Sequence, residues 1–128
     1  MLHVPGLFVA STNERNRGVF TSEVLQKGDL IEICPIIKIP TEELSHIHHT
    51  CLHDYYFVWE ESGYGACIAL GYGSLYNHNK NPNAQILLNY PDSTIHFEAT
   101  GCIQRGEEIC IDYTGGVKSK HRLWFDPV

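Results

Sequence analysis

Short apolar runs separated by turn residues predict a chain built mostly of short strands. Gly, Pro, Asn and Asp interrupt the runs, as is typical of strands joined by tight turns. The predicted strands are Leu7–Ala10, Gly18–Thr21, Leu30–Ile39, Ala84–Asn89, Thr94–Ala99 and Glu108–Asp112. The turns that separate the later ones are Lys27–Asp29, Tyr90–Ser93 and Arg105–Glu107.

The hairpin around Tyr90–Ser93 has the clearest pattern. Pro, Asp and Ser favour a turn there, between two apolar runs. In the second run, Ile95, Phe97 and Ala99 alternate with polar residues, so one face of this strand is expected to be buried.

One helix is predicted, over residues Thr41–Asp54. Thr41 can cap its first turn, and Glu42 and Glu43 suit the positive end of the helix dipole. Apolar residues recur at helical spacing and predict a buried stripe. These residues are Leu44, Ile47, Cys51, Leu52 and Tyr55.

Composition narrows the class of protein. The chain has 128 residues, 43% of them hydrophobic, and a net charge of −6, which favours one folded domain over disorder. No run of 18 apolar residues predicts a membrane-spanning helix, and Met1–Pro5 does not resemble a secretory signal, so a cytoplasmic location is expected. The acidic balance disfavours direct binding to nucleic acid and favours a basic, lysine-rich partner.

The five cysteines predict neither a disulfide framework nor a four-cysteine zinc site, because their number is odd and no two are spaced C-x-x-C. Buried, reduced thiols are expected instead.

Three polar segments are candidates for chemistry. Residues 70–84 hold four Asn, one His and one Pro within seven positions, which fits either an elaborate loop or the wall of a polar pocket. Gly106–Tyr113 fits a turn and a strand that ends on a tyrosine, and Asn16–Phe20 offers a glycine at which a ligand can approach the backbone.

Taken together and in this order, the three segments resemble the SET domain of protein lysine methyltransferases. The matching runs are Asn16–Phe20, Asn77–Asn83 and Gly106–Tyr113, and the resemblance extends from about Leu7 to Tyr113. It implies a mostly β SET fold of several small sheets, with one short inserted helix and a knot-like C-terminal segment. A single domain over 1–128 is expected, with a core at about 7–113 and a tail, 114–128, packed over the cofactor site. The chain looks like one of the short stand-alone SET proteins of viruses and bacteria.

The resemblance also implies that S-adenosylmethionine is the cofactor, that no metal is needed, and which residues form the site. The residues expected to hold the cofactor are Arg17, Gly18, Val19, Phe20, Tyr76, Asn77 and His78, with Trp124 and Phe125 over its adenine side. Tyr113 matches the catalytic tyrosine. Tyr55, with Tyr56 as the alternative, and Tyr72 are expected to line the lysine channel with Tyr113.

The chain departs from the family pattern at three places. Asn16 replaces a glycine of the first turn, and Asn tolerates left-handed backbone angles better than most residues. Asn79 stands where Ser is usual, and the cysteine-rich zinc segment that follows many SET domains is missing.

Histidines form a second pattern on the predicted helix. His46, His49 and His53 fall on one stripe, where they either bind a metal or form a solvated face. The solvated face is favoured, because no carboxylate or cysteine is placed to complete a closed metal site. We also consider a role for this stripe in peptide contact.

Three functions follow from these patterns. The leading one is an S-adenosylmethionine-dependent lysine methyltransferase that acts on a basic, lysine-containing protein tail, with a histone tail as one option. The alternatives are a catalytically silent SET-like module that binds a peptide, and a small metal-dependent nuclease. The sequence leaves open whether the chain forms a homodimer, and whether it acts in a host nucleus.

Overall fold

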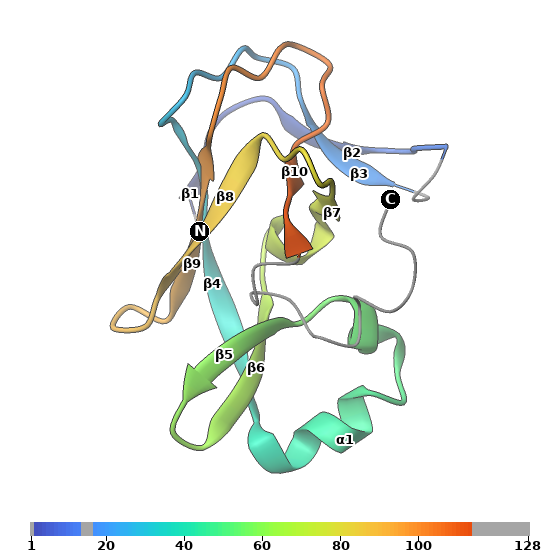
Figure 1. Cartoon of the computed structure of the whole chain (residues 1–128), viewed down its shortest axis with the longest axis vertical. Helices are drawn as coiled ribbons and strands as arrows, with labels where there is room; N and C mark the ends of the chain where they lie inside the picture. The colour runs from blue at the N-terminus through green and yellow to red at the C-terminus, as the bar shows by residue number, and fades with distance from the viewer. Residues whose placement is uncertain (1, 14–16, 114–128) are drawn as a thin grey trace.

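The computed structural model describes residues 2–13 and 17–113, which form one six-stranded sheet and two two-stranded sheets (Figure 1). The strands of the large sheet are β1 (Leu2–His3), β4 (Leu30–Pro40), β5 (Phe57–Glu61), β6 (Tyr64–Ala69), β8 (Ala84–Asn89) and β9 (Thr94–Ala99). The small sheets pair β2 (Leu7–Ala10) with β3 (Gly18–Thr21), and β7 (Asn77–His78) with β10 (Cys110–Ile111).

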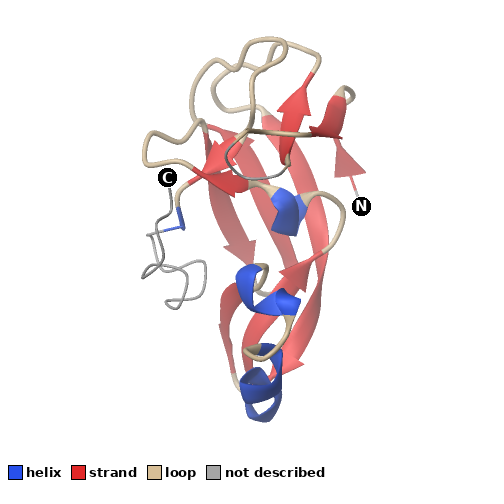
Figure 2. Ribbon diagram, turned by 90° about the vertical axis from the view of Figure 1, so that its right-hand side faces the viewer, coloured by secondary structure: helices blue, strands red, loops and turns tan. Residues whose placement is uncertain are grey.

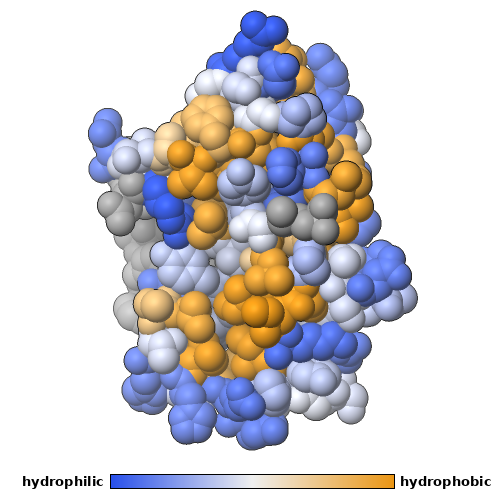
Figure 3. All heavy atoms as spheres, turned by 180° about the vertical axis from the view of Figure 1, so that it is seen from behind, coloured by the Kyte–Doolittle hydropathy of each residue, from blue (hydrophilic) through white to orange (hydrophobic). Residues whose placement is uncertain are grey.

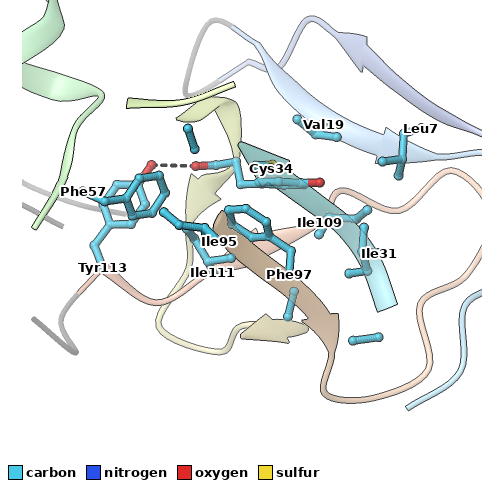
Figure 4. Close-up of a cluster of buried hydrophobic side chains, with 14 of the residues drawn as sticks. Leu7, Val19, Ile31, Cys34, Phe57, Ile95, Phe97, Ile109, Ile111 and Tyr113 are labelled. Atoms are coloured by element: carbon cyan, nitrogen blue, oxygen red, sulfur yellow. Dashed lines mark hydrogen bonds between the residues drawn. The ribbon is translucent and has the colours of Figure 1, made fainter. Parts of the chain in front are cut away.

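Strand β4 is the spine of the large sheet. Its first half pairs with β9 and its second half with β6, both antiparallel, so the strand order is β5-β6-β4-β9-β8. The predicted alternation in β9 is confirmed, because Ile95, Phe97 and Ala99 are all buried. These side chains belong to the main core, part of which is drawn in Figure 4.

Strands β7 and β10 run parallel, with Asn77 opposite Cys110 and His78 opposite Ile111. Parallel pairing joins two segments that are distant in the sequence, and it places the end of the described chain beside the Asn-rich segment (Figure 1). The passage of the C-terminal segment beneath a loop stays a prediction.

The predicted strands match the structure closely where turns bound them. Strands β2, β3, β8 and β9 have the predicted bounds, and β4 extends one residue further, to Pro40. The last strand is shorter than predicted, because Glu108 makes only an isolated bridge to Phe20. The sequence pattern did not predict β1, β5, β6 or β7.

The prediction of one continuous helix over Thr41–Asp54 is wrong. The segment divides into η1 (Thr41–Glu43), α1 (Leu44–Ile47) and η2 (Cys51–Asp54), which follow one another along one side of the large sheet (Figure 2). Thr50 causes the interruption. Its backbone is extended, and its hydroxyl donates to the Ile47 carbonyl and accepts from the Leu52 N–H.

The predicted cap and stripe also change. Thr41 makes no capping hydrogen bond, because Pro40 occupies the N-cap position of η1. Leu44 and Ile47 do pack against a small core of Ile39, Tyr56 and Ala66. Beyond the break, Cys51 and Leu52 are exposed.

Two exposed apolar side chains lie beside a pocket, whereas other apolar surface is scattered. Figure 3 shows apolar surface in separate patches among hydrophilic residues, on the face opposite to that of Figure 1. Among the exposed apolar residues, Leu52 and Leu70 border the pocket described below. No helix in the described ranges is long and apolar enough to cross a bilayer.

All five cysteines are free thiols, as predicted, but two of them are not buried. Cys34, Cys67 and Cys110 are buried, whereas Cys51 and Cys102 are exposed. Burial, and then the negative charge of Glu32, raises the pKa of the Cys34 thiol well above its ordinary value.

We expect only two thiols of the native protein to react with iodoacetamide at pH 8, because the reagent needs an accessible thiolate. Mass spectrometry of the labelled peptides should find Cys51 and Cys102 modified and Cys34 unmodified. Denatured protein is the control and should label at all five positions. Fast labelling of Cys34 in the native protein would contradict its placement in the core.

Candidate active site

The three predicted motifs meet around the β7–β10 pair. The Asn79 N–H donates to the Ile111 carbonyl at 3.0 Å, and the Asn83 N–H donates to the Cys110 carbonyl at 3.2 Å. On the other side of β10, the Ile109 N–H donates to the Val19 carbonyl at 2.8 Å. The backbone therefore joins the segments around positions 18, 78 and 110 into one local structure.

Asn77 connects these segments through its side chain. Its Nδ2 donates to the Arg17 carbonyl and to Glu108 Oε2, both at 2.7 Å. Since both neighbours are acceptors, only the NH2 group can face them, and this fixes the orientation of the amide. Oδ1 is left without a hydrogen-bond partner among the described residues, as an acceptor for a ligand.

Gly18 is required by this connection. A Cβ at this position would collide with the Glu108 carboxylate and would lie 2.9 Å from Asn77 Nδ2. The missing side chain thus serves a protein contact on that side, and the approach of a ligand to this backbone stays a prediction.

Asn83 and Glu108 lie within the predicted motifs, although the sequence assigns no role to either. The Asn83 amide donates to the Glu108 carbonyl and accepts from the Cys110 N–H, both at 2.9 Å. An Asn bonded in this way holds the backbone on both sides of Ile109. The signal for it was the position of Asn83 directly before a predicted strand.

Tyr113 lies at the end of this structure and is buried. Its hydroxyl donates to the Tyr76 carbonyl at 2.7 Å, and its N–H donates to Nδ1 of His78 at 2.9 Å. The second bond leaves Nδ1 without a proton, so a neutral His78 ring carries its hydrogen on Nε2. The Asp112 carboxylate is 3.8 Å from the same nitrogen, which is too long for a hydrogen bond.

Arg17 and Tyr55 line the same pocket and contact each other. The Arg17 guanidinium donates to the Tyr55 hydroxyl at 3.0 Å and to the Leu75 carbonyl at 3.4 Å, and it lies 5.3 Å from the centre of the Tyr55 ring. The pocket has a volume of about 310 Å³. It is lined by Arg17, Leu52, Tyr55, Ile68, Ala69, Leu70, Gly71, Ser74 and Leu75.

The structure distinguishes the two neighbouring tyrosines. Tyr55 lines the pocket, whereas Tyr56 is buried in the small core with its hydroxyl 2.8 Å from Nε2 of His48. Tyr55, the first choice from the sequence, is therefore the one that a ligand in the pocket can touch.

Of the predicted site residues that the structure describes, Arg17 and Tyr55 line this pocket and the others, Asn77 and Tyr113 included, do not. The Tyr72 hydroxyl donates to the Leu7 carbonyl at 3.4 Å, and Tyr72 is absent from the pocket lining. Val19 is fully buried in the main core, and the Phe20 ring stacks on Phe8 at 5.8 Å. Trp124 and Phe125, like Asn16 and the rest of the tail, lie outside the described residues.

The three histidines do not form the predicted stripe, because the helix is interrupted at Thr50. His46 and His49 are exposed, and His53 is half-buried with its ring edge-on to His48 at 5.4 Å. In residues 2–13 and 17–113, no group of three or more His, Cys, Asp or Glu could hold a metal ion.

Comparison with known proteins agrees with this arrangement. Residues 16–114 match the SET domain family. A Schizosaccharomyces pombe protein named "Histone-lysine N-methyltransferase, H3 lysine-37 specific" is 33% identical over 121 residues, which cover 94% of this chain and 77% of that protein.

Two solved structures have the same fold. A Plasmodium falciparum protein described as a candidate histone methyltransferase superposes with a TM-score of 0.73 at 30% identity, over 90% of this chain and 96% of that one. A chain of ctPRC2, in an autoinhibited conformation bound to S-adenosylmethionine, superposes with a TM-score of 0.70 at 17% identity, over 92% of this chain and 16% of that one.

The mostly β fold with several sheets is thus confirmed, while a viral or bacterial type stays a prediction, since neither the Schizosaccharomyces nor the Plasmodium relative is of that kind. The match extends over most of the described core and includes all of the segments that converge on Asn77 and Tyr113. The chain belongs to the SET-domain family of protein lysine methyltransferases.

Proposed function

We propose that this chain transfers a methyl group from S-adenosylmethionine to a lysine in the tail of histone H3. The observation that carries the proposal is the convergence of Asn77 and Tyr113 on the β7–β10 pair, with the Tyr113 hydroxyl fixed by the Tyr76 carbonyl at 2.7 Å. Such convergence supplies a rigid place for two reactants to meet, which is the main requirement of a direct group transfer.

The residues present fit the cofactor. The pocket that Arg17 lines has a volume of about 310 Å³, at the lower end of the range of small-molecule pockets, roughly 300–1,000 Å³, and Arg17 is the one residue of the expected cofactor set in its described lining. The Arg17 guanidinium suits a carboxylate, and Oδ1 of Asn77 suits an amine, so these two residues would hold the amino-acid end of the cofactor. The backbone of Gly18–Phe20, Tyr76 and His78 also belong to the expected binding set. When bound, S-adenosylmethionine supplies the activated methyl group.

Tyr113 would position the lysine amine. Its hydroxyl donates its only hydrogen to the Tyr76 carbonyl, so toward an amine it can act only as an acceptor. An acceptor at this point orients the amine through an N–H bond and leaves the nitrogen lone pair for the reaction. Tyr113 is also almost fully buried, which excludes water from this side of the amine.

Charge and relatedness support a histone tail as the substrate. The net charge of −6 attracts a lysine-rich segment. The Schizosaccharomyces pombe relative carries an H3 lysine specificity in its name, at 33% identity over most of both chains.

The first test is binding of the cofactor and its product. We expect calorimetry to find one saturable site for S-adenosylmethionine and for S-adenosylhomocysteine. Arg17→Ala should weaken binding of S-adenosylhomocysteine at least about tenfold, because a charge-assisted hydrogen bond contributes roughly 1.5–3 kcal/mol. Arg105→Ala, which removes an exposed arginine in a turn, is the matched control and should bind as the wild type does.

The second test is transfer of tritium from labelled S-adenosylmethionine to recombinant histone H3. Labelled histone would support the proposal, and a chain that binds cofactor but labels neither histone H3 nor other core histones would overturn the substrate assignment. A chain that binds histone H3 peptide but neither form of the cofactor would instead be the silent binding module.

A further inference from the structure

A carboxylate is buried within the main core, on the spine strand β4. Glu32 is fully buried, and Ile31 before it and Cys34 two positions after it are buried core residues as well. Figure 4 shows these two residues among the apolar side chains that surround this part of the sheet. A buried charge is costly unless it is hydrogen-bonded, so the bonds of Glu32 indicate what it is for.

Two donors satisfy this carboxylate. Oε1 accepts from the Tyr76 hydroxyl at 2.7 Å, and Oε2 accepts from the Tyr72 N–H at 3.0 Å. No basic side chain within the described ranges forms an ion pair with it. Burial, and then the charge of Glu32, raises the pKa of the Tyr76 hydroxyl well above its ordinary value, so Tyr76 keeps its proton and remains the donor.

These two bonds hold the two ends of one short segment, residues 72–76. Between the ends, Gly73 packs so closely on the sheet that a Cβ there would lie 2.5 Å from the Cβ of Ala69. The Ser74 hydroxyl accepts from the Ala69 N–H at 3.0 Å. The segment is therefore fastened to the large sheet along its whole length.

Two carbonyls of this segment accept hydrogen bonds from side chains of the candidate site. The Leu75 carbonyl accepts from the Arg17 guanidinium at 3.4 Å, and the Tyr76 carbonyl accepts from the Tyr113 hydroxyl at 2.7 Å. The Tyr76 hydroxyl thus donates to Glu32, while the Tyr76 carbonyl accepts from the hydroxyl of Tyr113. A shift of Tyr76 would move the carbonyl that accepts the hydrogen bond of the Tyr113 hydroxyl.

We infer that Glu32 is a positioning residue for methyl transfer, which acts through Tyr76 on the hydroxyl of Tyr113. The inference rests on the proposed function, since it concerns the same site. It adds a contact from the core that neither Asn77 nor the pocket supplies.

The test compares Tyr76→Phe and Glu32→Gln with the wild type, using histone H3 as substrate. Tyr76→Phe removes only the hydroxyl, and Glu32→Gln keeps the shape of the side chain. We expect kcat to fall about tenfold in each, with the KM for histone H3 and the affinity for S-adenosylhomocysteine within a factor of about two of the wild type, because the interaction affected is one made at the reacting centre. Tyr90→Phe is the matched control, since its hydroxyl accepts an exposed hydrogen bond from the Glu60 N–H.

A double-mutant cycle separates positioning from a general loss of stability. If Tyr76 acts through Tyr113, the Tyr76→Phe change should cost no further activity in a Tyr113→Phe background, whereas its effect on Tm should persist. Equal losses of kcat in both backgrounds would overturn the inference, as would wild-type kcat in both single variants. Absence of cofactor binding and transfer in the wild type would instead be a failure of the proposed function.

Discussion

A Tyr113→Phe variant is expected to fold normally and to lose methyl transfer by a factor on the order of 10²–10³, the range seen when one positioned polar group is removed from an active site. The hydroxyl is held by the Tyr76 carbonyl and can act toward an amine only as an acceptor. Phenylalanine keeps the ring, and with it the contact to His78 at 5.1 Å, but it leaves the amine unoriented. The stability cost should be about 1 kcal/mol, the value of a single neutral hydrogen bond.

Three measurements on this variant separate chemistry from folding. Initial rates with labelled S-adenosylmethionine and histone H3 give kcat, calorimetry gives the affinity for S-adenosylhomocysteine, and thermal unfolding gives Tm. Only kcat should change strongly. Tyr90→Phe also loses one tyrosine hydroxyl bond and should retain full activity. A Tyr113→Phe enzyme as active as the wild type would remove Tyr113 from its assigned role.

The strands could be predicted where two local signals coincide. In β9, alternation between apolar and polar residues coincides with a Pro-Asp turn on one side, and both bounds were predicted correctly. In β5, Phe57 and Trp59 are buried and alternate with Val58 and Glu60, so the period was present. Only Tyr55 and Tyr56 separate the helical segment η2 from this strand, and neither is a typical turn residue.

The predicted helix was too long because the hydrogen bonds of one residue interrupt it, although the apolar residues keep helical spacing. Leu44 and Ile47 obey the helical spacing and pack as predicted. Thr50 offers the backbone an alternative set of hydrogen bonds, to Ile47 and Leu52, and the chain adopts it. Periodicity counts apolar positions and does not include this competition.

The sequence could predict which residues belong to the candidate site, but not the hydrogen bonds that join them. Resemblance named Asn77 and Tyr113, and the structure brings their strands together. Which atom of Asn77 faces a ligand depends on Glu108 and on the Arg17 carbonyl, and these contacts join segments far apart in the chain. The same is true of Glu32, which pattern alone would place on a strand without indicating that Tyr76 binds it.

An Asn77→Asp variant is expected to lose both stability and cofactor binding. The two shapes are nearly identical, but aspartate would present an oxygen where the amide now donates to the Arg17 carbonyl and to Glu108. Both acceptors would lose their donor, and two carboxylates would face each other at 2.7 Å. We expect the free energy of unfolding to fall by about 2–3 kcal/mol. Binding of S-adenosylhomocysteine should weaken on the order of a hundredfold, because repulsion displaces the Arg17–Gly18 backbone as well as Oδ1.

A second change can restore part of what this variant loses. Glu108→Gln in the Asn77→Asp background replaces the facing carboxylate with an amide that can donate to it, so Tm and affinity should recover together. Asn89→Asp is the matched control: it makes the same chemical change beside another carboxylate, Asp92, in an exposed hairpin turn, and both quantities should stay near the wild-type values. Thermal unfolding and calorimetry on the four proteins measure this directly. If Asn77→Asp binds S-adenosylhomocysteine as tightly as the wild type does, the amide is not held as described, and Asn77 cannot be the group that connects the first turn of the site to its last strand.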